Sequence, residues 1–70
     1  MIISSLVIDR NSPYLGKTIA MSGIRHPGNC MVIGFERDGV EYFNPSIQTE
    51  FEIDDLVWVV GEKHDVEKLL

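Results

Sequence analysis

The sequence predicts an α+β fold: a small β-α-β-β-β-α domain with a mostly antiparallel four-stranded sheet and two short helices. Three observations support this prediction. Asp38 and Gly39 lie between two apolar segments, which is typical of a tight hairpin turn. Residues 56–60 are apolar at every position, as in a strand buried on both faces. Residues 66–70 place apolar side chains at the i, i+3 and i+4 spacing of a helix.

The first half of the chain contains one predicted strand and one predicted helix. Residues 4–8 are rich in β-branched side chains and precede a polar stretch, which favours a strand. Apolar side chains then recur at helical spacing over residues 15–22, and Gly23 follows as a helix-ending glycine. Because this helix has barely two turns, we expect packing to hold it together.

The second half contains the hairpin, a further strand and the last helix. Asn44 and Pro45 interrupt the strand pattern after the hairpin. The predicted elements are residues 30–37 and 40–43 for the hairpin, 47–55 for an irregular connection, 56–60 for the fourth strand and 64–70 for the second helix.

The small size of the chain predicts that it needs a partner. A domain of 70 residues buries only about 60% of the surface of its unfolded chain, so its own core gives marginal stability. The only cysteine is Cys30, and His26 and His64 lie far apart, so neither a disulfide nor a metal site is expected.

Two of the predicted strands are apolar at every position, whereas two short helices can cover only one face of a sheet. A second copy, or a neighbouring domain, is the simplest cover for the other face, and a sheet curled into a barrel-like form is the alternative. The residues expected at the dimer interface are Met31, Val32, Ile33 and Trp58.

Composition and charge exclude several classes of protein. With 44% apolar and 24% charged residues, the chain is not a disordered one. No apolar run reaches the roughly 20 residues of a membrane span, and the single cysteine favours a cytoplasmic protein. The net charge of −5 argues against nucleic-acid binding. Residues 1–35 carry +2 and residues 36–70 carry −7, so an anionic ligand is expected near the first half.

No residue pattern indicates catalysis. Gly16, Lys17 and Thr18 resemble the end of a phosphate-binding P-loop, but Asn11 stands where that motif needs a glycine. The acidic residues within 50–55 fit no calcium loop and are interpreted as a solvated connection. Because no nucleophile, base or metal-ligand set is present, we predict no catalytic residue, no metal site and no enzymatic activity.

Arg25 is the main candidate for ligand binding. It follows Gly23, opens a Pro-Gly loop and belongs to the positively charged half of the chain. A guanidinium in such a loop suits bidentate binding of a phosphate or carboxylate, and the adjacent His26 would reach the same anion. A solvated arginine, or one in a salt bridge between subunits, is the alternative interpretation.

Four segments of the chain occur in a specific order and spacing: residues 13–19, residues 32–39, Asn44 with Pro45, and Phe51 followed by residues 55–61 and the terminal helix. Together these segments resemble the TrkA C-terminal domain, also called the C-terminal part of the regulator of potassium conductance (RCK_C). The resemblance covers nearly the whole chain. Asp54 stands where this family usually has glycine.

The resemblance implies that residues 1–70 form one cytoplasmic regulatory domain of a potassium or other cation transport protein. Such domains form homodimers, and their partner would be a membrane-embedded potassium channel, uptake system or cation/proton antiporter, without nucleic acid. The domain would be tethered to, or associated with, that transport protein. Several family members bind a small ligand, cyclic di-AMP among them, in a cleft between the two copies.

The resemblance also implies roles for single residues. Arg25 matches the arginine that approaches the ligand's phosphates, and Ile19 and Pro45 would supply apolar lining. Gly23 and Met31 occupy the positions of an acid and an amide that complete the site in those members. No cofactor is therefore certain, and the ligand would be a cyclic dinucleotide or another small anion. A purely structural assembly module without a ligand is the alternative function.

Overall fold

The computed structural model describes residues 1–70. Its sheet is antiparallel throughout, with the strand order β1-β4-β2-β3. This arrangement confirms the predicted α+β class, but with one helix instead of two. The elements are β1 (Ile2–Val7), β2 (Met31–Arg37), β3 (Val40–Phe43), β4 (Leu56–Gly61) and α1 (Lys63–Glu67).

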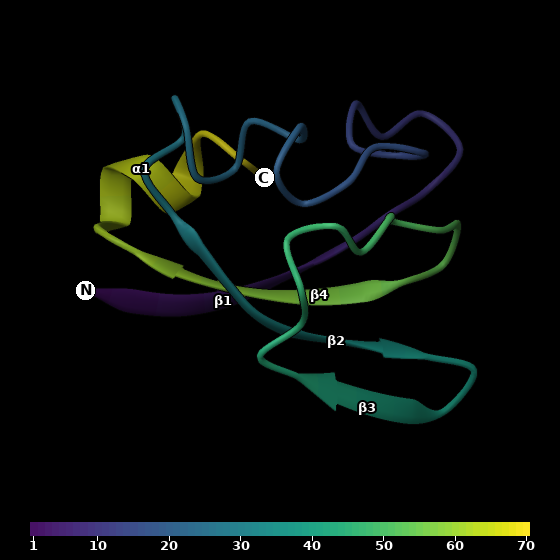
Figure 1. Ribbon diagram of the computed structural model, residues 1–70. Helices are drawn as coiled ribbons and strands as arrows, with labels where there is room; N and C mark the ends of the chain where they lie inside the picture. The colour runs from purple at the N-terminus through teal and green to yellow at the C-terminus, as the bar shows by residue number, and fades with distance from the viewer.

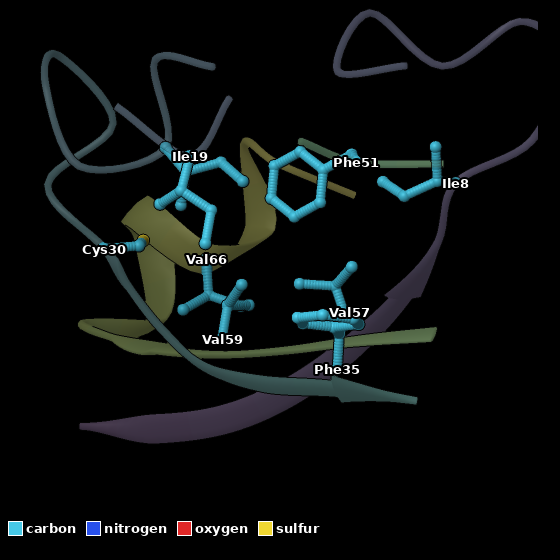
Figure 2. Packing of buried hydrophobic residues seen from close by; sticks show 9 residues of the cluster. Ile8, Ile19, Cys30, Phe35, Phe51, Val57, Val59 and Val66 are labelled. Carbon is cyan, nitrogen blue, oxygen red and sulfur yellow. The ribbon is translucent and has the colours of Figure 1, made fainter. Parts of the chain in front are cut away.

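The loops and α1 cover one face of the sheet, and the core lies between these two layers (Figure 1). Alternate side chains of β4 and β2 point into this layer because successive residues of a strand face opposite sides. Figure 2 shows Val57, Val59 and Phe35 rising from the strands toward the loops, and each is at most 4% exposed. They pack with Ile8, Ile19, Ile24, Cys30, Phe51 and Val66.

No segment of the chain covers the other face of the sheet (Figure 1). β1 pairs only with β4 and β3 only with β2, so the sheet is open and does not curl into a barrel. On the uncovered face Phe43 stacks on Trp58 with ring centroids 5.8 Å apart. Phe43 is 63% exposed, and Ile3 and Val7 of β1 are 68% and 55% exposed. One apolar face therefore remains in contact with water in the single chain.

The predicted hairpin is present as β2 and β3. Asp38 and Gly39 have φ values of +53° and +79°. Positive φ at both central residues is the backbone conformation of the two-residue turn that fits the twist of a hairpin. Arg37 and Val40 face each other across this turn.

The predicted helix over residues 15–22 is wrong. This segment runs beside the later connection instead: the Ile19 N–H donates to the Thr49 carbonyl at 2.9 Å, and the Phe51 N–H donates to the Lys17 carbonyl at 3.0 Å. A helix of two turns gains too little from its own hydrogen bonds to compete with these long-range ones. The last helix is present, but it covers Lys63–Glu67 rather than residues 64–70.

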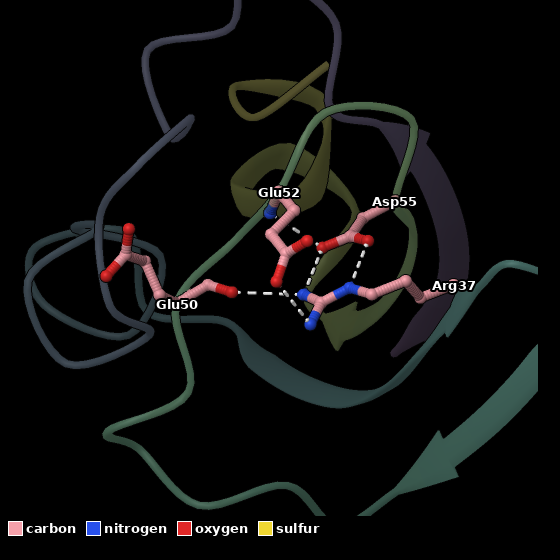
Figure 3. A network of polar contacts seen from close by, with 4 residues as sticks. All are labelled: Arg37, Glu50, Glu52 and Asp55. Carbon is pink, nitrogen blue, oxygen red and sulfur yellow. Dashed lines mark hydrogen bonds and ion pairs between the residues drawn. The ribbon is translucent and has the colours of Figure 1, made fainter.

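The interpretation of the acidic segment as a solvated connection is wrong at Asp55, which is fully buried. Figure 3 shows its carboxylate facing the Arg37 guanidinium, with Nε to Oδ1 at 2.8 Å and Nη2 to Oδ2 at 2.7 Å. The Glu52 N–H also donates to Asp55 Oδ2 at 2.8 Å. The hydrogen bond with Asp55 raises the pKa of Arg37 above its ordinary value. This pair, which we call the Arg37–Asp55 clamp, joins the end of β2 to the turn before β4.

Candidate ligand-binding site

A hollow of about 190 Å³ lies where three segments meet: the loop before β2, the first residues of β2 and the segment after β3. Six of its nine lining residues are hydrophobic. We call this feature the Arg25 hollow. It is lined by Ile19, Ile24, Arg25, Cys30, Met31, Val32, Asn44, Pro45 and Ile47.

The loop that carries Arg25 closes on itself through backbone hydrogen bonds. The Gly28 N–H donates to the Gly23 carbonyl at 2.8 Å, and the Asn29 N–H donates to the Arg25 carbonyl at 2.8 Å. A Cβ at Gly28 would lie 2.6 Å from the Gly23 oxygen, so this loop shape requires glycine there. The backbone of Arg25 is thus held at the edge of the hollow. Its guanidinium makes no ion pair and no hydrogen bond within the chain.

The walls of the hollow are apolar. Ile19 is 7% exposed, whereas Ile47 on the opposite segment is 55% exposed. Cys30 is buried, and burial, together with the negative charge of Asp65, raises the pKa of its thiol. The thiol therefore stays protonated near neutral pH and serves as an apolar wall rather than a nucleophile. Such walls suit the flat face of a base or another apolar ring.

The structure brings three of the four predicted ligand-binding residues together. Arg25, Ile19 and Pro45 line the same hollow. His26 lines a neighbouring, more open hollow to which Arg25 also contributes. The binding roles of these four residues stay predictions.

The predicted dimer residues divide between two surfaces. Met31 and Val32 line the Arg25 hollow, and Ile33 lies at a β-bulge between Val32 and Gly34. Trp58 lies on the uncovered face of the sheet, beside Phe43. The interface roles of these residues also stay predictions.

Asn44 also lines the hollow, although the sequence analysis predicts only its neighbour Pro45 as a ligand-binding residue. Its φ of +49° turns the chain after β3, and its N–H donates to the Ile33 carbonyl at 2.9 Å. This turn places Asn44 in the lining of the hollow. The sequence signal that could have identified Asn44 is its amide side chain directly before Pro45.

No group of three or more His, Cys, Asp or Glu side chains is placed to hold a metal ion.

The fold and the hollow define a class: a small antiparallel α+β domain with an unpaired arginine at the edge of an apolar recess. The TrkA-C domain family matches residues 3–70, and the chain therefore belongs to this family. It is a family of regulatory rather than catalytic domains. A comparison of the sequence with curated proteins gives no match.

Solved structures share the fold at low sequence identity. The RCK_C domain dimer of S. agalactiae BusR in complex with c-di-AMP is 19% identical with a TM-score of 0.84, and the match covers 99% of this chain and 91% of that one. The RCK C domain of the potassium transport protein KtrA in complex with c-di-AMP is 21% identical with a TM-score of 0.83, covering 94% of this chain and 75% of that one.

A third similar structure corrects the predicted partners. S. agalactiae BusR in complex with its busAB promoter DNA is 19% identical with a TM-score of 0.83, and the match covers 96% of this chain but 33% of that one. The prediction of a membrane-embedded transport partner and no nucleic acid is therefore wrong. The charge of a 70-residue domain does not determine what the remainder of a longer protein binds. The one helix, α1, is too short to cross a membrane.

Proposed function

We propose that residues 1–70 form a ligand-sensing regulatory domain, without enzymatic activity, of a protein that controls the transport of potassium or a related cation. The domain acts as a homodimer and binds a cyclic dinucleotide such as c-di-AMP at the Arg25 hollow. The observation that carries this proposal is the unpaired guanidinium at the edge of an apolar recess. The c-di-AMP complexes of two domains of the same fold support it, and the single buried thiol supports a cytoplasmic location.

The size of the hollow supports binding between two copies. At about 190 Å³ it is smaller than the roughly 300–1,000 Å³ of pockets that hold drug-sized ligands. The combined volume of two such hollows falls within that range. A cyclic dinucleotide has two equivalent halves, so its symmetry matches that of a two-fold dimer. One base and one phosphate would then belong to each copy.

Each lining residue contacts a different part of the ligand. The Arg25 guanidinium pairs with a phosphate through two charge-assisted hydrogen bonds, and His26 adds a polar contact beside it. Ile19 and Pro45 form apolar walls for the base. The Asn44 amide supplies the polar group that Met31 lacks, and an amide can pair bidentately with the edge of adenine.

The dimer contact proposed here involves Met31, Val32 and Ile33, because these residues lie at or beside the hollow. A contact through Trp58 would use the uncovered face as well. A ligand gripped by both copies favours the dimer arrangement in which the two hollows face each other. The dimer thus has two arrangements, one with the hollows facing each other and one without. The response of the attached protein depends on how much more tightly the ligand binds the first arrangement than the second.

An assembly module that binds no ligand is the second candidate. The observation that favours it is the absence of an acid at Gly23 and of an amide at Met31. Under this alternative the same dimer forms, but Arg25 contacts only solvent or the second copy.

Calorimetric titration with c-di-AMP, c-di-GMP and ATP separates the two candidates. We expect c-di-AMP to bind with one ligand per two chains, and Arg25→Ala to weaken binding at least tenfold, since a hydrogen bond to a charged group contributes about 1.5–3 kcal/mol. Lys17→Ala is the matched control, because Lys17 is an exposed cation outside the hollow. A flat titration with all three nucleotides would reject ligand sensing and leave the assembly module.

A further inference from the structure

β1 leaves one edge of the sheet without a hydrogen-bonding partner. It lies at the end of the order β1-β4-β2-β3 and pairs with β4 alone (Figure 1). No backbone hydrogen bond outside the strand ladders involves residues 2–7. The side of β1 that faces away from β4 therefore presents unpaired N–H and C=O groups along a six-residue strand.

The sequence of β1 contains none of the features that protect an edge strand. Ile2–Val7 has no charged residue, no proline and no bulge. The opposite edge, β3, is four residues long and carries Glu41 directly opposite Glu36 of β2. Pairing between two copies through β3 would gather these carboxylates, which repel each other. Charge therefore disfavours self-association at β3 and permits it at β1.

We propose that β1 pairs antiparallel with β1 of a second copy of this chain, so that two sheets join into one continuous sheet. The unpaired backbone groups require an extended strand as the occupant. A copy of β1 is such a strand, and its apolar side chains match those of its counterpart.

The exposed side chains select the register. A two-fold axis perpendicular to the sheet at Ser5 keeps the uncovered faces of both copies on the same side. Ile3 then lies opposite Val7 of the partner subunit, and the same pair forms again on the other side of the axis. Ile3 and Val7 are the two most exposed apolar residues of β1, at 68% and 55%. In this register each of these side chains gains one apolar cross-strand neighbour from the second copy.

The β1 contact is separate from the Arg25 hollow. β4 lies between β1 and β2, and no residue of β1 lines the hollow. The two contacts can therefore form at the same time, and two different two-fold contacts link dimers into larger assemblies. The inference holds whether or not a nucleotide binds.

Disulfide trapping tests this register. Ser5→Cys places two thiols directly opposite each other, where Cα atoms of paired strands lie about 4.5–5.5 Å apart, within disulfide reach. Ser4→Cys is the matched control, because Ser4 points to the other face and would lie opposite Leu6 of the partner subunit. The wild type has only the buried thiol of Cys30. With oxidised glutathione, we expect Ser5→Cys to form a covalent dimer at least tenfold faster than Ser4→Cys or the wild type.

A second substitution distinguishes pairing from random collision. Adding Val7→Lys to Ser5→Cys places an unpaired charge in the contact and should slow trapping at least fivefold; Ile3→Lys should do the same. Both side chains are mostly exposed, so circular dichroism should show an unchanged fold. The proposal is overturned if Ser5→Cys forms no covalent dimer, if Ser4→Cys is trapped equally fast, or if neither lysine slows trapping.

Discussion

At the scale of single residues, Asp54 shows how a turn tolerates an unfavourable side chain. Its φ of +70° is a left-handed conformation in which glycine is more stable than other residues. The Asp54 N–H donates to the Ile8 carbonyl at 2.6 Å, and the Ile8 N–H donates to the Asp55 carbonyl at 2.8 Å. These bonds hold the turn before β4 in spite of the unfavourable backbone conformation of Asp54.

We therefore expect Asp54→Gly to raise the free energy of unfolding by about 0.5 kcal/mol, because glycine removes the cost of the left-handed backbone but adds some unfolded-state entropy. Asp54→Ala keeps that cost and should be no more stable than the wild type. Urea unfolding followed by Trp58 fluorescence measures both. A glycine variant less stable than the alanine variant would contradict this account of the turn.

At the scale of elements, Gly34 decides how closely β2 and β3 approach. A Cβ at Gly34 would lie 2.5 Å from the Tyr42 carbonyl oxygen and 3.0 Å from the Phe43 ring. Phe43 lies opposite Gly34 and stacks on Trp58 of β4. The missing side chain thus lets one aromatic ring cross β2 and contact the strand beyond it.

Gly34→Ala should lower the free energy of unfolding by about 1–3 kcal/mol, the usual cost of overpacking a close contact. Gly39→Ala is the control within the same hairpin. Gly39 has φ +79°, but a Cβ there would meet no atom within 4 Å, so the cost of alanine is conformational and about 1 kcal/mol. Chemical denaturation measures both variants, and the near-ultraviolet signal of Trp58 should change only in Gly34→Ala. An unchanged signal there would show that the stack does not depend on this glycine.

At the scale of the whole molecule, the Arg37–Asp55 clamp connects the sheet to the layer of loops (Figure 3). Arg37 also contacts the Glu50 carbonyl at 3.0 Å and the exposed Glu52 carboxylate at 2.8 Å. Asp55 has no exposed surface, so its carboxylate depends on these partners. A domain of this size has a total stability of only about 4–10 kcal/mol.

Arg37→Ala should cost about 3–5 kcal/mol, because it leaves the Asp55 carboxylate buried and unpaired. This loss is a large part of the total stability of a domain of this size. Glu52→Gln, which removes only the exposed arm of the network, should cost less than about 1 kcal/mol. Thermal unfolding compares the two, and equal midpoints for both variants would show that the buried pair contributes no more than the exposed one.

Elements with local signals were predictable from the sequence alone. The Asp38 and Gly39 turn specifies its hairpin, and the unbroken apolar run specifies β4, because turn chemistry and side-chain burial act over a few neighbouring residues. Arg25 was predicted as a ligand-binding residue in the same way, from its glycine, its loop and the charge of its surroundings, and this role stays a prediction. The uncovered apolar face also followed from the sequence, because its strands carry more apolar surface than the chain can cover.

Features that depend on distant partners were decided only by the tertiary structure. The backbone of residues 15–22 is determined by hydrogen bonds to residues 47–51, and Asp55 is buried because Arg37 reaches it from another strand. Asn44 enters the hollow for the same kind of reason, since the sheet brings the end of β3 beside the loop of Arg25. Local propensities of less than about 1 kcal/mol per residue cannot outweigh several such long-range hydrogen bonds. No local sequence pattern predicts these bonds, because their partners are distant in the chain.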